Sequence, residues 1–204
     1  MSTLKINTLQ IGQSGTATNN FCWSQPSTPD GTVRLGNGNA GSATDILIAT
    51  SSGNLGLGVT PSAWSSITAF ELANGTALGS YSSGAIPNMY LGTNCYYDGS
   101  WKYKVAGSYR ATRYLQSSGG EHQWYNSSAG TSGNIISFTQ ALTLTAAANL
   151  LLGGTADPGG SNALYIANRG SVPGTPSGGG VIYVESGALK YKGSSGTVTT
   201  LANA

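Results

Sequence analysis

One glycine pattern in the sequence is of the kind that cradles phosphate groups in nucleotide-binding proteins. Gly36, Gly38 and Gly41 stand in a literal G-x-G-x-x-G order after a predicted strand. A dinucleotide site needs a helix that opens at the third glycine and an acidic residue about 20 residues further on. Ser42–Thr50 runs into the turn Ser51–Gly53, so about two helical turns would fit at most, and no acidic residue has the required spacing. The pattern therefore predicts a turn, and we expect no cofactor.

Candidates for acid–base or nucleophilic chemistry are few. The single histidine, His122, follows Glu121, and the central segment offers only Asp98 and Glu121 as paired carboxylates. A nucleophilic triad needs a histidine base, and glycoside hydrolysis needs two carboxylates about 5–10 Å apart. A lone histidine among aromatic residues is more often packed or hydrogen-bonded than catalytic. We therefore expect no catalytic residues and a protein that is not an enzyme.

The two cysteines, Cys22 and Cys95, form no CxxC motif, and with one histidine they cannot supply the ligands of a zinc site. Isolated cysteines of this kind are usually buried and behave as small apolar residues. We expect two free thiols, no disulfide and no metal site.

The chain shows no targeting or nucleic-acid signal. Met1–Leu9 carries one lysine and no apolar core, so we expect no signal peptide. No apolar run approaches the roughly 18 residues of a membrane span, so no membrane insertion is expected. The net charge of +2 is too weak for electrostatic binding of nucleic acid. These features indicate assembly in a cytoplasm.

The composition is typical of short strands joined by tight turns. Glycine supplies 31 of 204 residues without a collagen period, and charged residues make up 8%, against about 25% in ordinary domains. Disordered chains are poor in aromatic residues, whereas this one has 11 Tyr and 4 Trp. No segment keeps a capped helical period over three turns. The sequence therefore predicts an all-β fold with less than about 15% helix.

Strand signals recur at short intervals along the chain. Pro61–Asn74 is predicted as a loop followed by a strand, and the C-terminal part as a β-meander by its turn chemistry. The predicted strands are Thr32–Leu35, Asp45–Thr50, Leu55–Leu57, Met89–Leu91, Trp101–Val105, Tyr109–Leu115, His122–Tyr125, Ile135–Thr139, Val181–Val184, Ala188–Tyr191 and Thr197–Leu201.

An internal repeat brackets the central segment. Asn54–Pro61 (NLGLGVTP) matches Asn149–Thr155 (NLLLGGT), and each copy follows an apolar strand and precedes another strand with the dipeptide Ala-Asn. Self-similarity of this kind marks stacked units that bury their faces on their neighbours. The repeat and the composition suggest five parts: a strand–turn region at 1–74, an aromatic-rich β domain at 75–140, a second copy of the repeat at 141–169, a linker at 170–180 and a C-terminal β-meander at 181–204.

Most aromatic residues lie within the central segment, and two interpretations of them stay open. They could form a platform that stacks on sugar rings, or they could pack as a core or as a subunit interface. Their number exceeds what a glycan site of a few stacked rings would use, which favours packing. The basic residues among them are expected to form a solvated rim. The candidate glycan or interface residues are Tyr96, Tyr97, Trp101, Tyr103, Trp124 and Tyr125, and the basic residues are Lys102, Lys104, Arg110 and Arg113.

Several segments, taken in order, resemble predicted bacteriophage tail and virion structural proteins of the tail-fibre or head-fibre type. One of these segments, Asn54–Pro61, is similar to the strand–turn repeats of tail fibres. No single motif is specific, but the series covers most of the chain. The segments are Thr28–Thr50, Asn54–Pro61, Tyr96–Tyr103, Glu121–Tyr125, Ile135–Leu144 and Gly178–Leu201.

This resemblance implies a non-enzymatic virion structural protein, a short fibre or appendage or a capsid-decoration subunit, located in the virion. Residues 1–74 are then the part that could dock to the virion. The alternative is a receptor-binding tail fibre that uses an aromatic glycan-binding surface. Short strands leave unpaired edges that need partners, so we expect a homotrimer, either fibre-like or a β-sandwich assembly of jelly-roll type. Other expected partners are capsid or tail components and, for the alternative, a host surface glycan.

Overall fold

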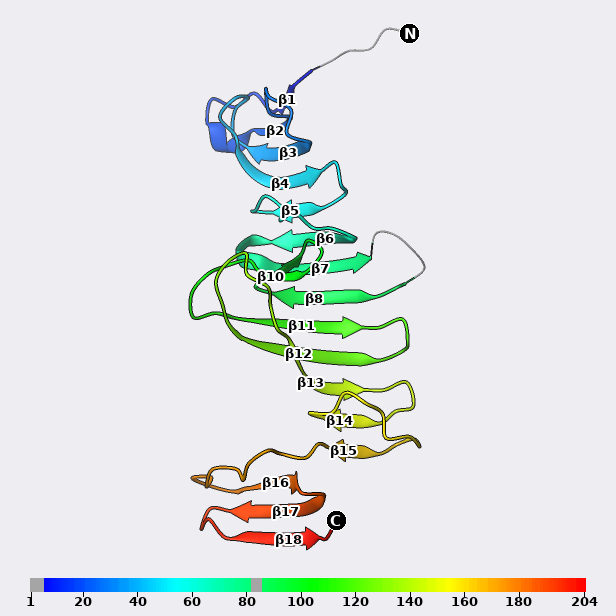
Figure 1. Ribbon diagram of the computed structural model, residues 1–204. Helices are drawn as coiled ribbons and strands as arrows, with labels where there is room; N and C mark the ends of the chain where they lie inside the picture. Colours follow the sequence, from blue (N-terminus) through cyan, green and yellow to red (C-terminus); the bar gives the residue numbers. More distant parts are fainter. Residues whose placement is uncertain (1–5, 82–85) are drawn as a thin grey trace. The chain divides into compact units, whose positions relative to one another are not determined.

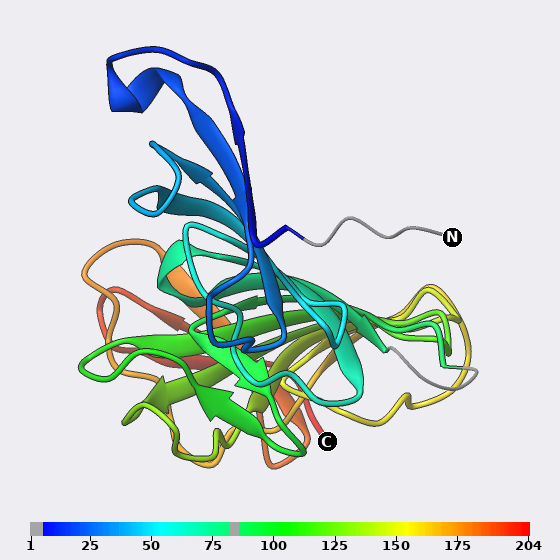
Figure 2. The same cartoon turned by 90° about the horizontal axis from the view of Figure 1, so that it is seen from above.

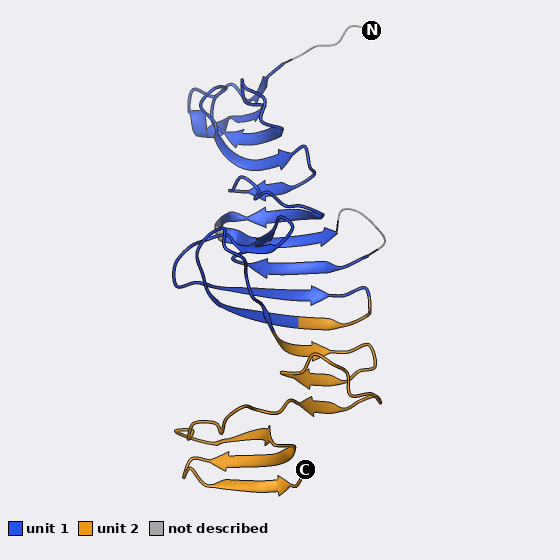
Figure 3. Ribbon diagram, in the orientation of Figure 1, with its two compact units in different colours: residues 1–118, 124–139 blue, residues 119–123, 140–204 orange. Residues whose placement is uncertain are grey.

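The computed structural model describes residues 6–81 and 86–204, which form strands and turns (Figure 1). Within those ranges, helical structure is confined to two single 3-10 turns, η1 (Ala17–Asn19) and η2 (Ala73–Gly75). The all-β prediction is therefore confirmed. The sequence predicts no signal peptide in Met1–Leu9. Residues 1–5 of this segment lie outside the described residues. The chain divides into two compact units, residues 1–118 with 124–139 and residues 119–123 with 140–204 (Figure 3).

The first unit is built from strands that pair in chain order. From β1 to β8 each strand pairs with the next, β11 then pairs with β8, and β9 and β10 form a separate hairpin. The strands are β1 (Thr8–Ile11), β2 (Phe21–Ser24), β3 (Thr32–Asn37), β4 (Thr44–Thr50), β5 (Leu55–Leu57), β6 (Ile67–Leu72), β7 (Thr76–Tyr81), β8 (Met89–Thr93), β9 (Cys95–Tyr97), β10 (Trp101–Tyr103), β11 (Arg110–Gln116) and most of β12 (His122–Ala129).

The stacked strands of this unit rotate steadily along the sheet. Seen from above, β1 to β3 point in a direction clearly different from that of β6 to β8 (Figure 2). L-amino acids impose such a twist on neighbouring strands. Short strands with glycine-rich turns accommodate the twist at every step.

The second unit contains two groups of strands. β13 (Thr139–Leu144) pairs antiparallel with β14 (Leu150–Leu152), which pairs parallel with β15 (Leu164–Ile166). β16 (Gly180–Glu185), β17 (Ala188–Gly193) and β18 (Val198–Ala202) form an antiparallel three-stranded sheet. The predicted C-terminal meander is therefore confirmed.

The predicted strand Ile135–Thr139 is wrong, because β13 begins only at Thr139. Ile135 makes a single bridge to Lys102, and the N–H of Ile136 donates to the carbonyl of Trp101 at 2.8 Å. The Ile136 side chain is buried in a small core cluster. The apolar residues of this segment therefore pack under aromatic side chains, and the segment before Thr139 is not a strand of the sheet.

The glycine pattern at Gly36–Gly41 is a turn, as predicted, since it joins β3 to β4 and no helix follows it. Gly38 and Gly41 have φ values of +134° and +85°, which side chains with a Cβ rarely adopt. A Cβ on Gly36 would lie 2.9 Å from that of Ala43. The glycines therefore serve a tight connection between two strands.

The sequence repeat is also a structural repeat. In both copies a strand pairs antiparallel with a three-residue strand, which then pairs parallel with the strand after it: β4, β5 and β6 in one copy and β13, β14 and β15 in the other. Gly58 and Gly153, which follow the short strands, have similar positive φ values of +68° and +72°. A short parallel connection is uncommon without a helix, so each copy needs particular side chains to hold its crossing loop.

A buried asparagine holds each copy together. Asn54 Oδ1 accepts from the N–H of Ala69 at 2.9 Å, and Asn149 Oδ1 accepts from the N–H of Ala163 at the same distance. Asn54 is 2% exposed and Asn149 is fully buried. Because the accepted N–H lies beyond the crossing loop, each amide ties the short strand to the parallel strand that follows.

We predict that Asn54→Ala lowers the free energy of unfolding by about 1–3 kcal/mol, because the N–H of Ala69 loses its partner inside the fold. Urea unfolding followed by tryptophan fluorescence measures this change. Asn203→Ala is the control, since Asn203 is exposed, and it should change stability by less than about 0.5 kcal/mol. Equal stability of the two variants would contradict the role given to Asn54.

Candidate functional site

The sheet of the first unit has two faces of opposite character. Along β5 to β8, alternate side chains are buried and exposed, as strand geometry requires when one face is covered. Ile67, Ala69 and Tyr90 are buried on one side, which we call the covered face. Phe70 and Leu78 point to the other side, which we call the open face.

An aromatic cluster packs on the covered face, with Trp101 at its centre. The ring centroid of Trp101 lies 5.4 Å from those of Tyr90 and Tyr97, 6.1 Å from that of Phe138 and 6.2 Å from that of Trp64. Most of these pairs are edge-on or tilted, the arrangements that aromatic quadrupoles prefer. The cluster is the main core of this unit.

The six predicted aromatic residues do not form one exposed platform. Tyr96, Tyr97, Trp101 and Tyr125 pack against the core of the covered face. Tyr103 is buried in a neighbouring cluster, and its hydroxyl donates to the carbonyl of Ser128 at 2.8 Å. Trp124 lies apart from them, 39% exposed, with its ring centroid 5.0 Å from that of Tyr114. The geometry therefore favours packing for all of them except Trp124.

The prediction of a solvated basic rim is wrong for two of its four residues. The Arg113 guanidinium lies 4.3 Å from the ring centroid of Tyr125 and 4.8 Å from that of Trp101, and its buried Nε has no hydrogen-bond partner. Guanidinium groups stack on aromatic faces because these carry negative potential. Lys104 bonds to a buried carboxylate, at 2.8 Å. Both side chains thus contact the core and do not belong to a solvated rim, and the run of basic residues in the sequence does not indicate this.

That carboxylate belongs to Glu71, which the sequence analysis did not single out. Glu71 is 1% exposed on the covered face of β6, and it accepts hydrogen bonds from the N–H of Ser62 at 2.7 Å and from Trp64 Nε1 at 3.0 Å. Ser62 and Trp64 lie in the loop that crosses from β5 to β6. The carboxylate therefore fixes this loop and, through Lys104, the segment after β10. Its position after Ile67 and Ala69 in an alternating strand is the signal that could have revealed it.

The surroundings of Glu71 favour its ionised form. Burial by itself raises the pKa of this carboxyl, but the hydrogen bonds from Lys104, Ser62 and Trp64 outweigh burial and hold the pKa below its ordinary value. A carboxyl with a lowered pKa stabilises the fold above its ordinary pKa, and this contribution disappears as the pH falls through the folded-state pKa.

The carboxylates and cysteines considered above for catalysis or metal binding form other contacts or are buried. Asp98, in the first unit, pairs with Lys102 at 2.7 Å, and Glu121, in the second unit, accepts from the side-chain amide of Gln123 at 2.6 Å. Cys22 and Cys95 are free and buried, as predicted, and burial raises the pKa of the Cys95 thiol to about 12. Such a thiol stays protonated and unreactive at neutral pH.

Two further features are absent from the described ranges, 6–81 and 86–204: a cluster of metal-ligand residues and a membrane-spanning helix. No group of three or more His, Cys, Asp or Glu residues there could hold a metal ion. No helix in those ranges has the length and hydropathy needed to cross a bilayer.

The open face presents an apolar strip along the whole first unit. Its side chains lie opposite each other from strand to strand, so that they form two unbroken rows. One row contains Leu9, Trp23, Leu35, Leu47, Leu57 and Leu72. The other contains Val33, Ala49, Leu55, Phe70, Leu78, Leu91 and Tyr114.

Between β1 and β8 the open face is also uncharged. The charged residues of these strands are Arg34, Asp45 and Glu71. Alternation along the strands places Arg34 and Glu71 on the opposite side, and the register shift between Leu35 and Gly36 places Asp45 there, where it pairs with Arg34. Leu78 and Leu91 are 46% and 49% exposed. Large exposed apolar patches of this kind mark interaction surfaces in soluble proteins. The open face is therefore the candidate functional site.

Comparisons with protein-family models, curated proteins and solved structures gave no match for this chain. The resemblance to bacteriophage virion proteins stays a prediction.

We predict that Glu71→Gln lowers the free energy of unfolding by about 3 kcal/mol at pH 7, because Lys104 loses the charge of its buried partner. Chemical unfolding between pH 3 and pH 7 measures this difference, which should shrink as acid protonates Glu71 in the wild type. Glu185→Gln removes the partly exposed pair with Lys190 and should cost much less. An unchanged difference across the pH range would contradict the assignment.

We predict that Trp101→Ala costs about 3–5 kcal/mol of stability, the usual loss for a large side chain at the centre of a core. Trp124→Ala is the matched control, because its ring is 39% exposed and outside this core, and it should cost much less. Thermal unfolding followed by circular dichroism compares them. Equal losses would show that Trp101 is not central to the covered face.

Proposed function

We propose that this chain is a structural subunit that assembles with copies of itself through the open face, and that the assembly is an appendage of a bacteriophage virion. The appendage would be a short fibre or a capsid decoration, bound to capsid or tail components. The observation that carries the self-assembly is the uncharged apolar strip of the open face. The virion assignment rests on the sequence resemblance.

The size of the strip fits a stable interface. Nine of the thirteen side chains in the two rows of the open face are 38% to 50% exposed. With full areas of roughly 150–250 Å² for the largest side chains, they expose together roughly 800 Å², which is about what each partner buries in a stable complex. An identical copy matches the strip best, because both surfaces are then uncharged and repeat with the same strand spacing.

The width of the strip favours three copies around one axis. β5 and β6 each present two apolar side chains to the open face, whereas β7 presents one, Leu78, between Thr76 and Ser80. Two alternate positions along a strand are about 7 Å apart. A strip this narrow is buried most completely at a shared axis, where the flanking polar side chains stay at the rim.

The ionisable groups of the covered face support a structural role. Glu71 is paired with Lys104, and Arg34 is paired with both Asp30 and Asp45. These pairs hold loops to strands. In the receptor-binding alternative the aromatic residues would be exposed, whereas most of them are packed into cores.

We predict that Phe70→Asp converts the assembly to monomers, because a carboxylate would be buried without a partner in the interface. Light scattering coupled to size-exclusion chromatography measures the mass. Ile135→Asp is the control, since Ile135 is 68% exposed outside the open face and its replacement should leave the assembly intact. Loss of assembly in both variants, or in neither, would contradict an interface at the open face.

The virion assignment is tested in particles from bacteria infected with the phage that encodes the chain. The chain should sediment with particles in a density gradient at a fixed copy number per particle, and antibodies should label one feature of the particle. A chain that remains with the soluble host proteins would refute the assignment.

A further inference from the structure

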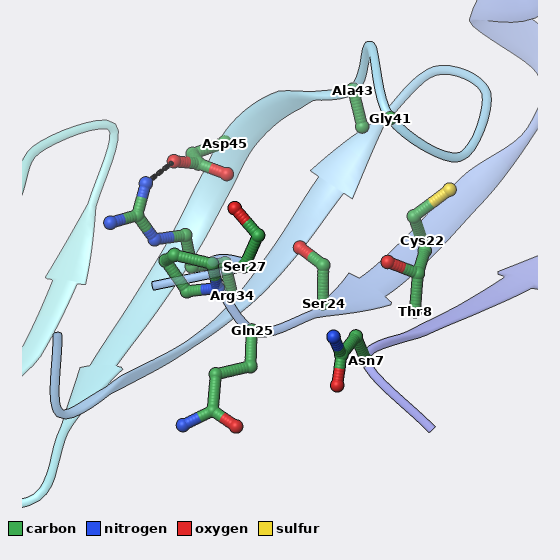
Figure 4. A pocket seen from close by; sticks show the side chains of 11 residues that line it. Asn7, Thr8, Cys22, Ser24, Gln25, Ser27, Arg34, Gly41, Ala43 and Asp45 are labelled. Carbon is green, nitrogen blue, oxygen red and sulfur yellow. Dashed lines mark hydrogen bonds and ion pairs between the residues drawn. The ribbon is translucent and has the colours of Figure 1, made fainter. Parts of the chain in front are cut away.

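A polar pocket lies on the first unit, on the side of the sheet opposite the open face (Figure 4). It is formed by β1 to β4, by the segment after β2 and by the turn that contains Gly41 and Ala43. Its volume is about 400 Å³, which falls within the range of sites for small molecules. The core packing and the open face do not use this pocket.

Several polar side chains that line the pocket have no hydrogen-bond partner within the described residues. The hydroxyls of Ser24 and Ser27 point toward the strand that carries Asp45 (Figure 4), and neither hydroxyl forms a hydrogen bond. The side-chain amide of Asn7 also has no partner in the described part of the chain, and Asp45 Oδ2 alone is used, by Arg34. The pocket thus offers a free hydroxyl on β2, a carboxylate oxygen on β4, and an amide and a second hydroxyl from the segments before β1 and after β2.

The charges around the pocket disfavour an anionic ligand. Arg34 donates from Nε to Thr32 at 3.0 Å and from its two terminal nitrogens to Asp30 and Asp45, so each of its three nitrogens already has a partner. Two carboxylates surround this one guanidinium, and the local charge is therefore negative. A phosphate or a carboxylate would meet repulsion, because the guanidinium that could attract it is already paired with two carboxylates.

We propose that this pocket binds an uncharged polyhydroxylated ligand, a mono- or disaccharide. Sugar hydroxyls both donate and accept hydrogen bonds. The amide of Asn7 and the hydroxyls of Ser24 and Ser27 can also donate and accept, and the free oxygen of Asp45 can accept. The pocket has no aromatic lining, so the ligand is held by hydrogen bonds at its edges without ring stacking. This site differs from the aromatic surface of the receptor-binding alternative.

Because no aromatic ring stacks on the ligand, we expect the pocket to bind sugars weakly. A few neutral hydrogen bonds exchanged with water give a dissociation constant on the order of 1 mM. Copies of the pocket in one assembly would raise the effective affinity for a surface that carries many identical sugars. The saccharide site itself does not depend on the proposed virion role.

Saturation-transfer difference NMR on the full chain tests the site, because it detects weak ligands of large proteins. The probes are D-glucose, D-galactose, N-acetyl-D-glucosamine and lactose, with inorganic phosphate as the anionic probe. We expect transfer to at least one sugar and none to phosphate. In Asn7→Ala and Ser24→Ala, binding should weaken about fivefold to tenfold, the loss expected for one neutral hydrogen bond.

These variants should fold normally, because the side chains of Asn7 and Ser24 form no hydrogen bonds within the described residues. Ser65→Ala, at an exposed serine outside the pocket, is the control and should bind as the wild type does. Three results would overturn the proposal: no transfer to any of the sugars, a preference for phosphate, or equal sugar binding by the pocket variants and the control. Sugar binding without particle association would refute only the virion assignment, and the reverse result would refute only the saccharide site.

Discussion

The alternation of side chains along short strands is the constraint on which the structure of the first unit depends. Each strand sends one set of side chains to the covered face and the next set to the open face, so a sheet one layer thick must bury two surfaces. The aromatic cluster around Trp101 buries the first of them within the chain. The second surface, marked by Phe70 and Leu78, stays exposed, and the cost of leaving apolar area in water supports the proposal that other copies bury it.

The covered face is held by interactions that connect segments distant in sequence. Glu71 gathers the crossing loop before β6 and Lys104 after β10, and Arg113 fills the space between rings that come from several strands. Buried charges are costly unless every donor and acceptor is engaged, and Glu71 meets that condition with four hydrogen bonds. A rigid covered face keeps the strands that form the open face in register.

Local patterns in the sequence predicted the elements but not their long-range contacts. The repeat at Asn54 and Asn149 and the C-terminal meander were predictable because turn residues and alternation specify them. Ile135–Thr139 was mispredicted because an apolar run looks the same whether it pairs in a sheet or packs under rings. Aromatic density predicted packing correctly for Trp101. Alternation along β6 could have indicated that Glu71 points inward, but its contacts with Ser62, Trp64 and Lys104 depend on the fold and no local pattern shows them.

Native mass spectrometry of the wild-type chain tests the central claim most directly, because it counts copies without any substitution. If the open face is buried between copies around one axis, the dominant species at micromolar concentration has three times the 20.6 kDa mass of the chain. A stable monomer at that concentration, with its apolar strip in water, would contradict the account.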